Sequence, residues 1–161
     1  MEKKPSAWSI RPAAKGDLVR LGQLAGQLVR MHHATDPRRF FLVDSVEEGY
    51  ASWFSRELGR KGSIVLVAEQ DGVVIGYGYA TIEGQDWSLL LEDHGAVHDI
   101  FIDASARGSG VGEGIVRAIC AELEKRGAER IVLNTMVGNE SAQRLFERCG
   151  FRKTMIEMTR G

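Results

Sequence analysis

The apolar residues of this chain follow two spacings, and each spacing predicts its own kind of element. In the first thirty residues they recur every third or fourth position, at Leu18, Leu21, Leu24, Ala25 and Leu28. That period places one face of a helix against a core, and Asp17, just before it, is a suitable N-cap. We therefore expect a long amphipathic helix that begins near residue 17.

Short apolar runs rich in β-branched residues predict strands. The runs at 64–68 and 73–79 flank Asp71-Gly72, a dipeptide that accepts the positive φ angles of a tight turn, so they should form an antiparallel hairpin. The rest of the pattern gives the order β-α-α-β-β-β-α-β-α-β. The remaining elements are expected at 10–14 (strand), 45–58 (helix), 96–102 (strand), 109–126 (helix), 130–135 (strand), 139–149 (helix) and 152–158 (strand).

Length and charge narrow the class of protein. A chain of 161 residues and 17.8 kDa, without repeats or linkers, is expected to form a single domain over 1–161. A net charge of −1 gives no bulk attraction to nucleic acid or an anionic membrane, so neither is an expected partner. No apolar run approaches the ~18 residues of a membrane span, and Cys120 and Cys149 lie in apolar helical patterns. We expect a cytoplasmic protein with two buried, unpaired thiols.

The segment with the clearest chemistry is Arg-Gly-Ser-Gly-Val-Gly at residues 107–112. It follows the apolar run 100–102 and opens the helix expected at 109–126. A strand that runs into a glycine-rich turn and then a helix leaves several backbone N–H groups at the positive end of the helix dipole. Such a turn binds phosphate, and Arg107 adds a fixed positive charge.

Two other phosphate-binding loops do not fit this segment. The dinucleotide pattern Gly-x-Gly-x-x-Gly fails because its third glycine is replaced by Glu113 in one register and by Ile115 in the other. A P-loop requires Gly-Lys-Ser/Thr, and no lysine occurs between Lys61 and Lys125. The sequence therefore gives no support for nucleoside triphosphate chemistry.

The segment resembles instead the acyl-CoA loop of the GNAT superfamily of N-acetyltransferases, Arg/Gln-x-x-Gly-x-Gly/Ala after a strand, with Arg107, Gly110 and Gly112 in the defining places. A second family signature, Asn-x-x-Ala-x-x-Leu-(Tyr)-x-x-x-Gly-Phe, appears as Asn139, Ala142, Leu145, Phe146, Gly150 and Phe151. The opening Ile-Arg-Pro-Ala at 10–13 is also common in this family. The resemblance thus covers nearly the whole chain.

This resemblance implies a fold and a co-substrate. The fold is α/β of mixed type: a central, mostly antiparallel, splayed sheet of about six strands flanked by about four helices. The co-substrate is acetyl-CoA, whose pantetheine arm would enter between the splayed strands. The implied CoA-binding residues are Phe101, Ile102 and Asp103 for the arm, Arg107, Gly108, Ser109, Gly110, Val111 and Gly112 for the pyrophosphate, and Asn139, Ala142 and Phe146 for further contacts.

Acetyl transfer to an amine needs a group that removes a proton from that amine. His98 and Asp99 are the candidates, because they adjoin the cofactor strand, and polyamine acetyltransferases of this family carry acidic residues at both places. Successive strand residues face opposite sides, so only one of the pair should face the acyl group. A purely structural role for both is the alternative.

The clearest departure from the family pattern is Phe146, where many members carry the tyrosine that protonates the leaving thiolate. Ser141, Tyr77 or Tyr79 are possible substitutes, or CoA leaves as a thiolate; a thiol pKa of ~8.5 makes that only modestly unfavourable. The missing tyrosine also motivates an alternative function, a CoA-binding regulatory or interaction module without catalysis. Asn139 has two compatible interpretations: an N-cap, or a contact with the pantetheine amide.

The acceptor is expected to be a small-molecule or peptide amine, and its wall to include residues 31–41, Trp53 and Phe54, because the helical pair lies over the acyl group in this family. His32 and His33 suggest metal binding, but neighbouring helix residues point in different directions and no partners lie at ligand spacing. No metal is expected. A homodimer is expected from the family alone.

Overall fold

The computed structural model describes residues 7–161 as one five-stranded sheet with four α-helices. The strands lie in the order β1-β2-β3-β4-β5; all neighbours are antiparallel except β4 and β5, which are parallel. The elements are β1 (Ser9–Pro12), α1 (Leu18–Thr35), α2 (Val46–Glu57), β2 (Ser63–Gln70), β3 (Val73–Glu83), β4 (His94–Ile102), α3 (Val111–Lys125), β5 (Ile131–Leu133) and α4 (Glu140–Arg148).

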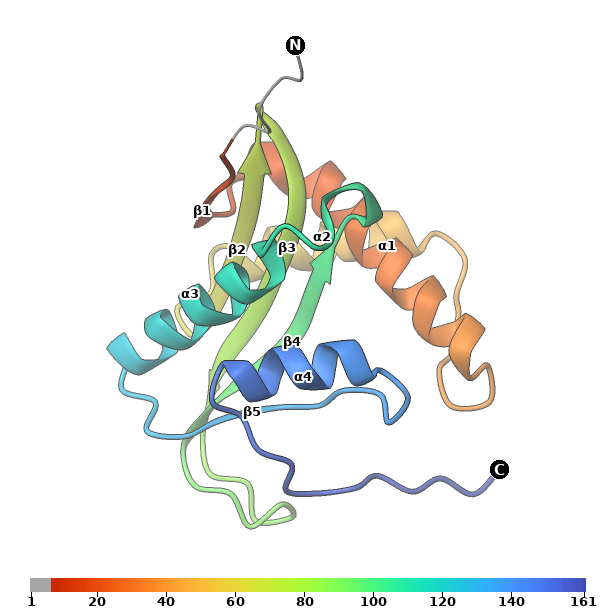
Figure 1. The fold of residues 1–161 in the computed structure, drawn as a ribbon, viewed down its shortest axis with the longest axis vertical. Helices are drawn as coiled ribbons and strands as arrows, with labels where there is room; N and C mark the ends of the chain where they lie inside the picture. The colour runs from red at the N-terminus through yellow and green to blue at the C-terminus, as the bar shows by residue number, and fades with distance from the viewer. Residues whose placement is uncertain (1–6) are drawn as a thin grey trace.

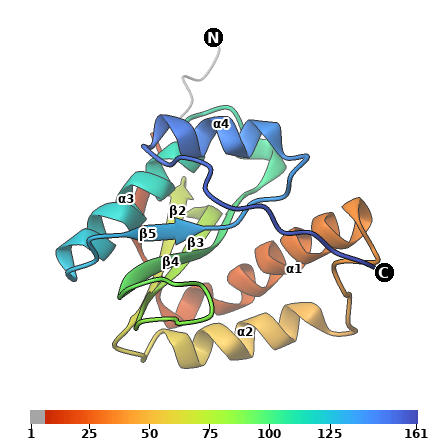
Figure 2. The ribbon, with the colours of Figure 1, turned by 90° about the horizontal axis from the view of Figure 1, so that it is seen from below.

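The sheet is the middle of three layers. Helices α1 and α2 lie together on one side of it, and α3 and α4 on the other (Figures 1 and 2). Each side has its own apolar cluster. On the α3 side, the helix contributes Val111, Ile115, Ile119 and Leu123, one residue per turn and each almost fully buried. The two clusters hold the helices against opposite faces of β2, β3 and β4.

The hairpin predicted from Asp71-Gly72 is confirmed. β2 and β3 pair antiparallel along their lengths, and both turn residues have positive φ angles, 52° for Asp71 and 76° for Gly72. The hairpin thereby sets the register of β3 against β2, and β3 is also one wall of the candidate site.

A bulge interrupts the next pair of strands. Tyr79 of β3 lies opposite Asp99, but its neighbour Ala80 lies opposite Val97, so His98 of β4 has no partner on β3. An extra residue of this kind locally breaks the strict alternation of side chains along a strand.

β4 and β5 pair over only three residues each. Gly95, Ala96 and Val97 lie opposite Ile131, Val132 and Leu133, and beyond Val97 no ladder joins the two strands. The sheet therefore splays at this point, as the resemblance implied, and the remainder of β4 has one open edge.

The sheet has five strands, not six. The strand expected at 152–158 is absent: the segment runs without ladder partners, and Met155, Ile156 and Met158 are all exposed. The segment alternates, with Thr154, Ile156 and Met158 on one side, but no strand lies beside it to accept its hydrogen bonds. Arg39, from the loop after α1, holds the segment through an ion pair with Glu157.

Both cysteines are free, as expected, but each is half-buried rather than buried. Burial raises the pKa of the Cys120 thiol to about 11, so this thiol is unreactive at neutral pH. Across residues 7–161, none of the helices is both long enough and apolar enough to cross a membrane.

Candidate functional site

The turn before α3 presents a row of backbone amides with no internal acceptor. Within the described structure, no hydrogen bond is formed by the N–H groups of residues 108–113, and the first bonded amide is that of Gly114, which donates to the carbonyl of Gly110 at 3.0 Å. Gly108 and Gly110 have φ angles of 80° and 83°, values that other residues rarely adopt. These amides are free to donate to an anion at the N-terminus of α3.

The glycines of this turn have different local roles. A Cβ at Gly108 would meet no atom within 4 Å, so that space is open to a ligand. A Cβ at Gly112, in contrast, would lie 3.2 Å from the side chain of Leu145, so this glycine also allows α4 to approach α3. Trp8 borders the turn, because its indole N–H donates to the carbonyl of Ser109 at 3.2 Å.

Arg107 is held over the end of β4. Its Nε donates to the carbonyl oxygen of Ile102 at 3.1 Å, and its guanidinium carbon lies 5.4 Å from the centroid of the Phe101 ring. The two contacts fix the guanidinium at the end of β4, and its terminal nitrogens have no partner among the described residues.

The main-chain N–H and C=O groups at the open edge of β4 are those of Ile100 and Ile102. The amide of Asp103 donates to Ile75 on β3 at 2.8 Å, which sets the alternation: residues 99, 101 and 103 bond to β3, and the groups of 100 and 102 point away from it. Asp103 is therefore not available to pair with a pantetheine arm, and its carboxylate binds Arg20 at 2.8 Å. Of the three expected arm residues, only Ile102 has main-chain groups at this edge.

Helix α4 lies beside the N-terminal part of α3. Asn139 is its N-cap, and Oδ1 accepts a hydrogen bond from the amide of Ala142 at 3.2 Å, so the capping interpretation is confirmed. Ala142 and Phe146 are half-buried, and Phe146 makes an edge contact with Phe151 at 6.1 Å between ring centroids. Position 146 is thus part of the apolar packing of the helix.

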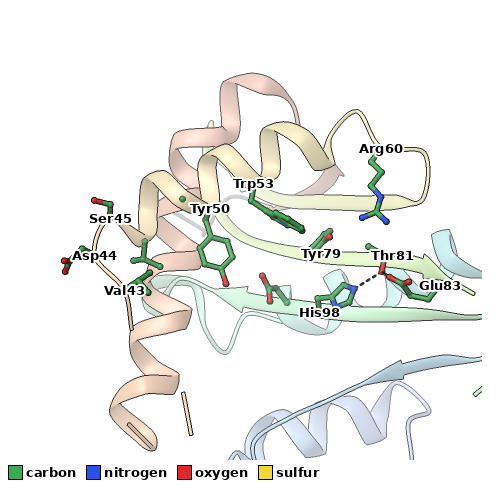
Figure 3. Close-up of a pocket in the computed structure, with 13 residues that line it drawn as sticks. Val43, Asp44, Ser45, Tyr50, Trp53, Arg60, Tyr79, Thr81, Glu83 and His98 are labelled. Atoms are coloured by element: carbon green, nitrogen blue, oxygen red, sulfur yellow. Dashed lines mark hydrogen bonds between the residues drawn. The ribbon is translucent and has the colours of Figure 1, made fainter. Parts of the chain in front are cut away.

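A pocket of about 590 Å³ lies between α2 and the strands β3 and β4 (Figure 3). Both His98 and Asp99 line it. The expectation that only one of them faces this side is wrong, because the bulge at His98 interrupts the alternation. The other lining residues are Val43, Asp44, Ser45, Val46, Gly49, Tyr50, Trp53, Arg60, Tyr79, Thr81 and Glu83.

The wall formed by the helical pair differs from the expected one. Trp53 lines the pocket, but Phe54 is fully buried and does not. The loop before α2 contributes residues 43–45, not the expected residues 31–41. His32 and His33 bond through Nδ1 to the carbonyls of Leu28 and Phe40. Residues 7–161 contain no cluster of three or more potential metal ligands.

Asp99 shares a hydrogen bond with the buried Tyr77. The Tyr77 hydroxyl donates to Oδ2 of Asp99 at 2.9 Å, and its own pKa is raised by burial and by that carboxylate. Burial also raises the pKa of Asp99, although the Tyr77 hydrogen bond acts in the opposite direction. A carboxylate with a raised pKa is a stronger proton acceptor than an exposed one.

Two of the possible substitutes for the missing tyrosine already donate their hydroxyl protons to carboxylates. Tyr77 donates to Asp99, and Tyr79 donates to the buried carboxylate of Glu57 at 2.7 Å. Tyr50, which the sequence analysis missed, is the third tyrosine of the chain. Its hydroxyl forms no hydrogen bond with the described residues, and it lines the pocket from α2. The helical spacing of α2 gave no sign of this role.

Comparison with known proteins finds similar sequences. A model of the Acetyltransferase (GNAT) family matches residues 28–151. Mycothiol acetyltransferase from Thermobispora bispora is 27% identical over 127 residues, which are 72% of this chain but only 41% of that protein. Glucosamine 6-phosphate N-acetyltransferase 1 from Oryza sativa subsp. japonica is 31% identical over 116 residues, 70% of this chain and 67% of that one.

The fold is similar to that of solved acetyltransferases. The aminoglycoside N-acetyltransferase AAC(6')-Iy in complex with CoA superposes with a TM-score of 0.74 at 21% identity, over 100% of this chain and 98% of that one.

Proposed function

Because this chain belongs to the GNAT acetyltransferase family, we propose that it transfers the acetyl group of acetyl-CoA to a primary amine by direct attack. The observation that supports this most is the row of free amides at 108–113. It lies at the end of the same strand, β4, that carries the open edge and the two pocket residues His98 and Asp99. One strand thus connects the free amides, an open edge with which an extended arm would pair, and a candidate base.

The residues present fit acetyl-CoA. The amides of 108–113 and the guanidinium of Arg107 would hold the pyrophosphate, and the groups of Ile100 and Ile102 would pair with the amides of the arm. When bound, acetyl-CoA supplies an activated acyl group. The amide side chain of Asn139 keeps its NH₂ group free for the arm, since only Oδ1 is used in the cap.

A base is needed because most primary amines are protonated at neutral pH. Deprotonating a lysine-like amine of pKa ≈ 10.4 at pH 7 costs about 4–5 kcal/mol. We assign this role to His98, which is exposed at the pocket, whereas Oδ2 of Asp99 is bonded to Tyr77. The hydroxyl of Tyr50 forms no hydrogen bond with the described residues, and we assign it to protonate the departing thiolate.

The acceptor binds, in this proposal, in the pocket under α2, as a small-molecule amine rather than a protein. A volume of about 590 Å³ suits a compact ligand, and Trp53 and Tyr50 offer flat apolar walls. Two of the relatives carry amino sugars in their names, so amino sugars are the first class to test. We further propose that the protein is cytoplasmic and works as a homodimer.

The test is thiol release from acetyl-CoA with a panel of amines: amino sugars, polyamines, amino acids and a peptide with a free N-terminus. We expect release with at least one class. Gly110→Val should remove CoA binding in calorimetry, because its side chain would occupy the anion's space. The matched control is Gly127→Val, since Gly127 also has a positive φ, 95°, at the far end of α3.

Two results would contradict the proposal. CoA binding without thiol release from any amine would favour a non-catalytic CoA-binding module. Unchanged CoA affinity in Gly110→Val would remove the turn from the binding site.

A further inference from the structure

His98 belongs to a chain of hydrogen bonds that continues along β3. Its Nε2 lies 2.7 Å from Oγ1 of Thr81, and the same hydroxyl donates to Oε1 of Glu83 at 2.6 Å. Tyr79, Thr81 and Glu83 are alternate residues of one strand and line the same pocket, and Figure 3 shows the contact between His98 and Thr81. Thr81 is only 2% exposed, so water does not compete for its hydroxyl.

Counting protons fixes the direction of this chain. A hydroxyl has one proton, and a carboxylate accepts hydrogen bonds without donating any. Because Thr81 gives its proton to Glu83, its oxygen must accept the bond from His98. The neutral imidazole therefore carries its proton on Nε2, and the lone pair remains on Nδ1.

We propose that Thr81 and Glu83 are positioning residues that set the tautomer of His98 and stabilise its protonated form; this rests on the proposed role of His98 as base. The amine forms its bond to the acetyl carbon, and the carbon–sulfur bond breaks with its electron pair on sulfur. The amine proton goes to Nδ1 of His98. Nε2 keeps its own proton, and Glu83 supplies the compensating negative charge through Thr81.

The ring is also fixed by its neighbour on β3. The ring centroids of His98 and Tyr79 lie 5.1 Å apart with the planes 32° from parallel, so the imidazole rests against a phenol that is itself tied to Glu57. One hydrogen bond and one ring contact thus hold an imidazole whose outer edge is open to the pocket.

The hydrogen bonds of this chain do not join those of the Tyr77–Asp99 pair, although His98 and Asp99 interact electrostatically. Tyr77 bonds to Asp99 and Thr81 bonds to His98, so each candidate base has its own partner on β3. The other titratable or charged groups around the pocket, none of them hydrogen-bonded to His98, are Asp44 from the loop, Tyr50 and Arg60 from α2 and its end, Tyr79 from β3 and Asp99 from β4.

Three variants separate the parts of this proposal. Thr81→Val keeps the shape and removes the hydroxyl, Thr81→Ser keeps the hydroxyl, and Glu83→Gln keeps an acceptor oxygen and removes the charge. The control is Thr35→Val at the exposed C-terminal end of α1. Circular dichroism and thermal melting check that each variant is folded.

The first readout is the nitrogen NMR spectrum of His98 across pH, which needs no substrate. We expect the Nε2–H tautomer in the unmodified protein, in Thr81→Ser and in Glu83→Gln, and a mixture of tautomers in Thr81→Val. An Nδ1–H tautomer in the unmodified protein, or a Thr81→Val variant with the same single tautomer as the unmodified protein, would overturn the proposal.

The second readout is the pH–rate profile with an accepted amine. Thr81→Val should lower kcat by about 10-fold with little change in KM for acetyl-CoA, and Thr81→Ser should restore most of it. Equal kcat and equal profiles in Thr81→Val and the unmodified protein would overturn the positioning role. If NMR shows the expected tautomer while His98→Ala keeps full activity, the hydrogen-bond chain stands and the proposed base is wrong.

Discussion

The carboxylate of Asp17 links the start of α1 to β1 and, through Arg11, to β2. It is 8% exposed and accepts two hydrogen bonds from Arg11 of β1, at 2.7 and 3.0 Å, and one from the amide of Ala14 at 2.8 Å. Arg11 also binds Glu69 of β2 at 3.0 Å. These hydrogen bonds, above all those from Arg11, lower the pKa of Asp17.

The lowered pKa predicts a pH-dependent contribution to stability. It is fully present above the unfolded-state pKa of about 3.9 and is lost as the pH falls through the lower folded value. Asp17→Asn should therefore reduce the free energy of unfolding by about 1–3 kcal/mol at pH 7, and by less at pH 3. Urea denaturation at both values measures it, with Asp93→Asn as control; an equal loss at both would exclude this origin.

At the level of single residues, the sequence identified the turn and the base candidates but not how the base is held. Gly110 and His98 could be found because glycine pattern and strand position are local properties. Thr81 and Tyr50 could not, since their roles depend on a bulge in β4 and on how α2 lies over the sheet. The spacing of apolar and polar residues predicts neither the bulge nor the position of α2.

At the level of elements, α1 and α2 approach so closely at one point that no side chain fits. A Cβ at Gly22 of α1 would collide with the carbonyl oxygen of Glu47 in α2 and lie 3.3 Å from Cβ of Ala51. Since α2 carries Tyr50 and Trp53, this contact also sets the height of the pocket wall over β3.

Gly22→Ala is expected to destabilise the protein by about 1–3 kcal/mol, because a backbone atom must move. The matched variant is Gly49→Ala in α2, where a Cβ would meet nothing within 4 Å, and there the free energy of unfolding should rise by about 0.5–1 kcal/mol. Thermal melting of both variants tests the contact. A stabilised Gly22→Ala would show that the helices are not so close.

The helices and the first four strands were predicted correctly, and the strands expected after α3 were not. The helices expected at 45–58, 109–126 and 139–149 are found with ends shifted by a few residues, as α2, α3 and α4. The strand expected at 130–135 shrinks to Ile131–Leu133, and that at 152–158 is absent. A strand exists only where a neighbour accepts its hydrogen bonds, and the splay after Val97 withdraws that neighbour.

At the scale of the whole molecule, the C-terminal segment leaves apolar side chains in solvent. Met155, Ile156 and Met158 are 77%, 83% and 89% exposed, and Val137 is 92% exposed. Three of these four side chains lie within the four residues 155–158, and clustered exposed apolar side chains mark interaction sites. It is the region we expect to form the interface of the proposed homodimer.

Sedimentation velocity tests this expectation. The unmodified protein should sediment as a dimer at micromolar concentration, and the double variant Ile156→Lys, Met158→Lys as a monomer. The control is Val73→Lys, at another exposed apolar residue on the β2–β3 hairpin. An unmodified protein that sediments as a monomer, or a double variant that sediments as a dimer, would contradict the proposal that this segment forms the dimer interface.

The proposed function depends on the free amides of residues 108–113 binding the pyrophosphate of CoA. Amide NMR spectra recorded during a titration with CoA measure this binding residue by residue. We expect the resonances of the amides of 108–113 to shift together and saturate with CoA, while that of the Asp103 amide, bonded to Ile75, moves little. CoA that binds and leaves the amides of 108–113 unmoved would contradict it.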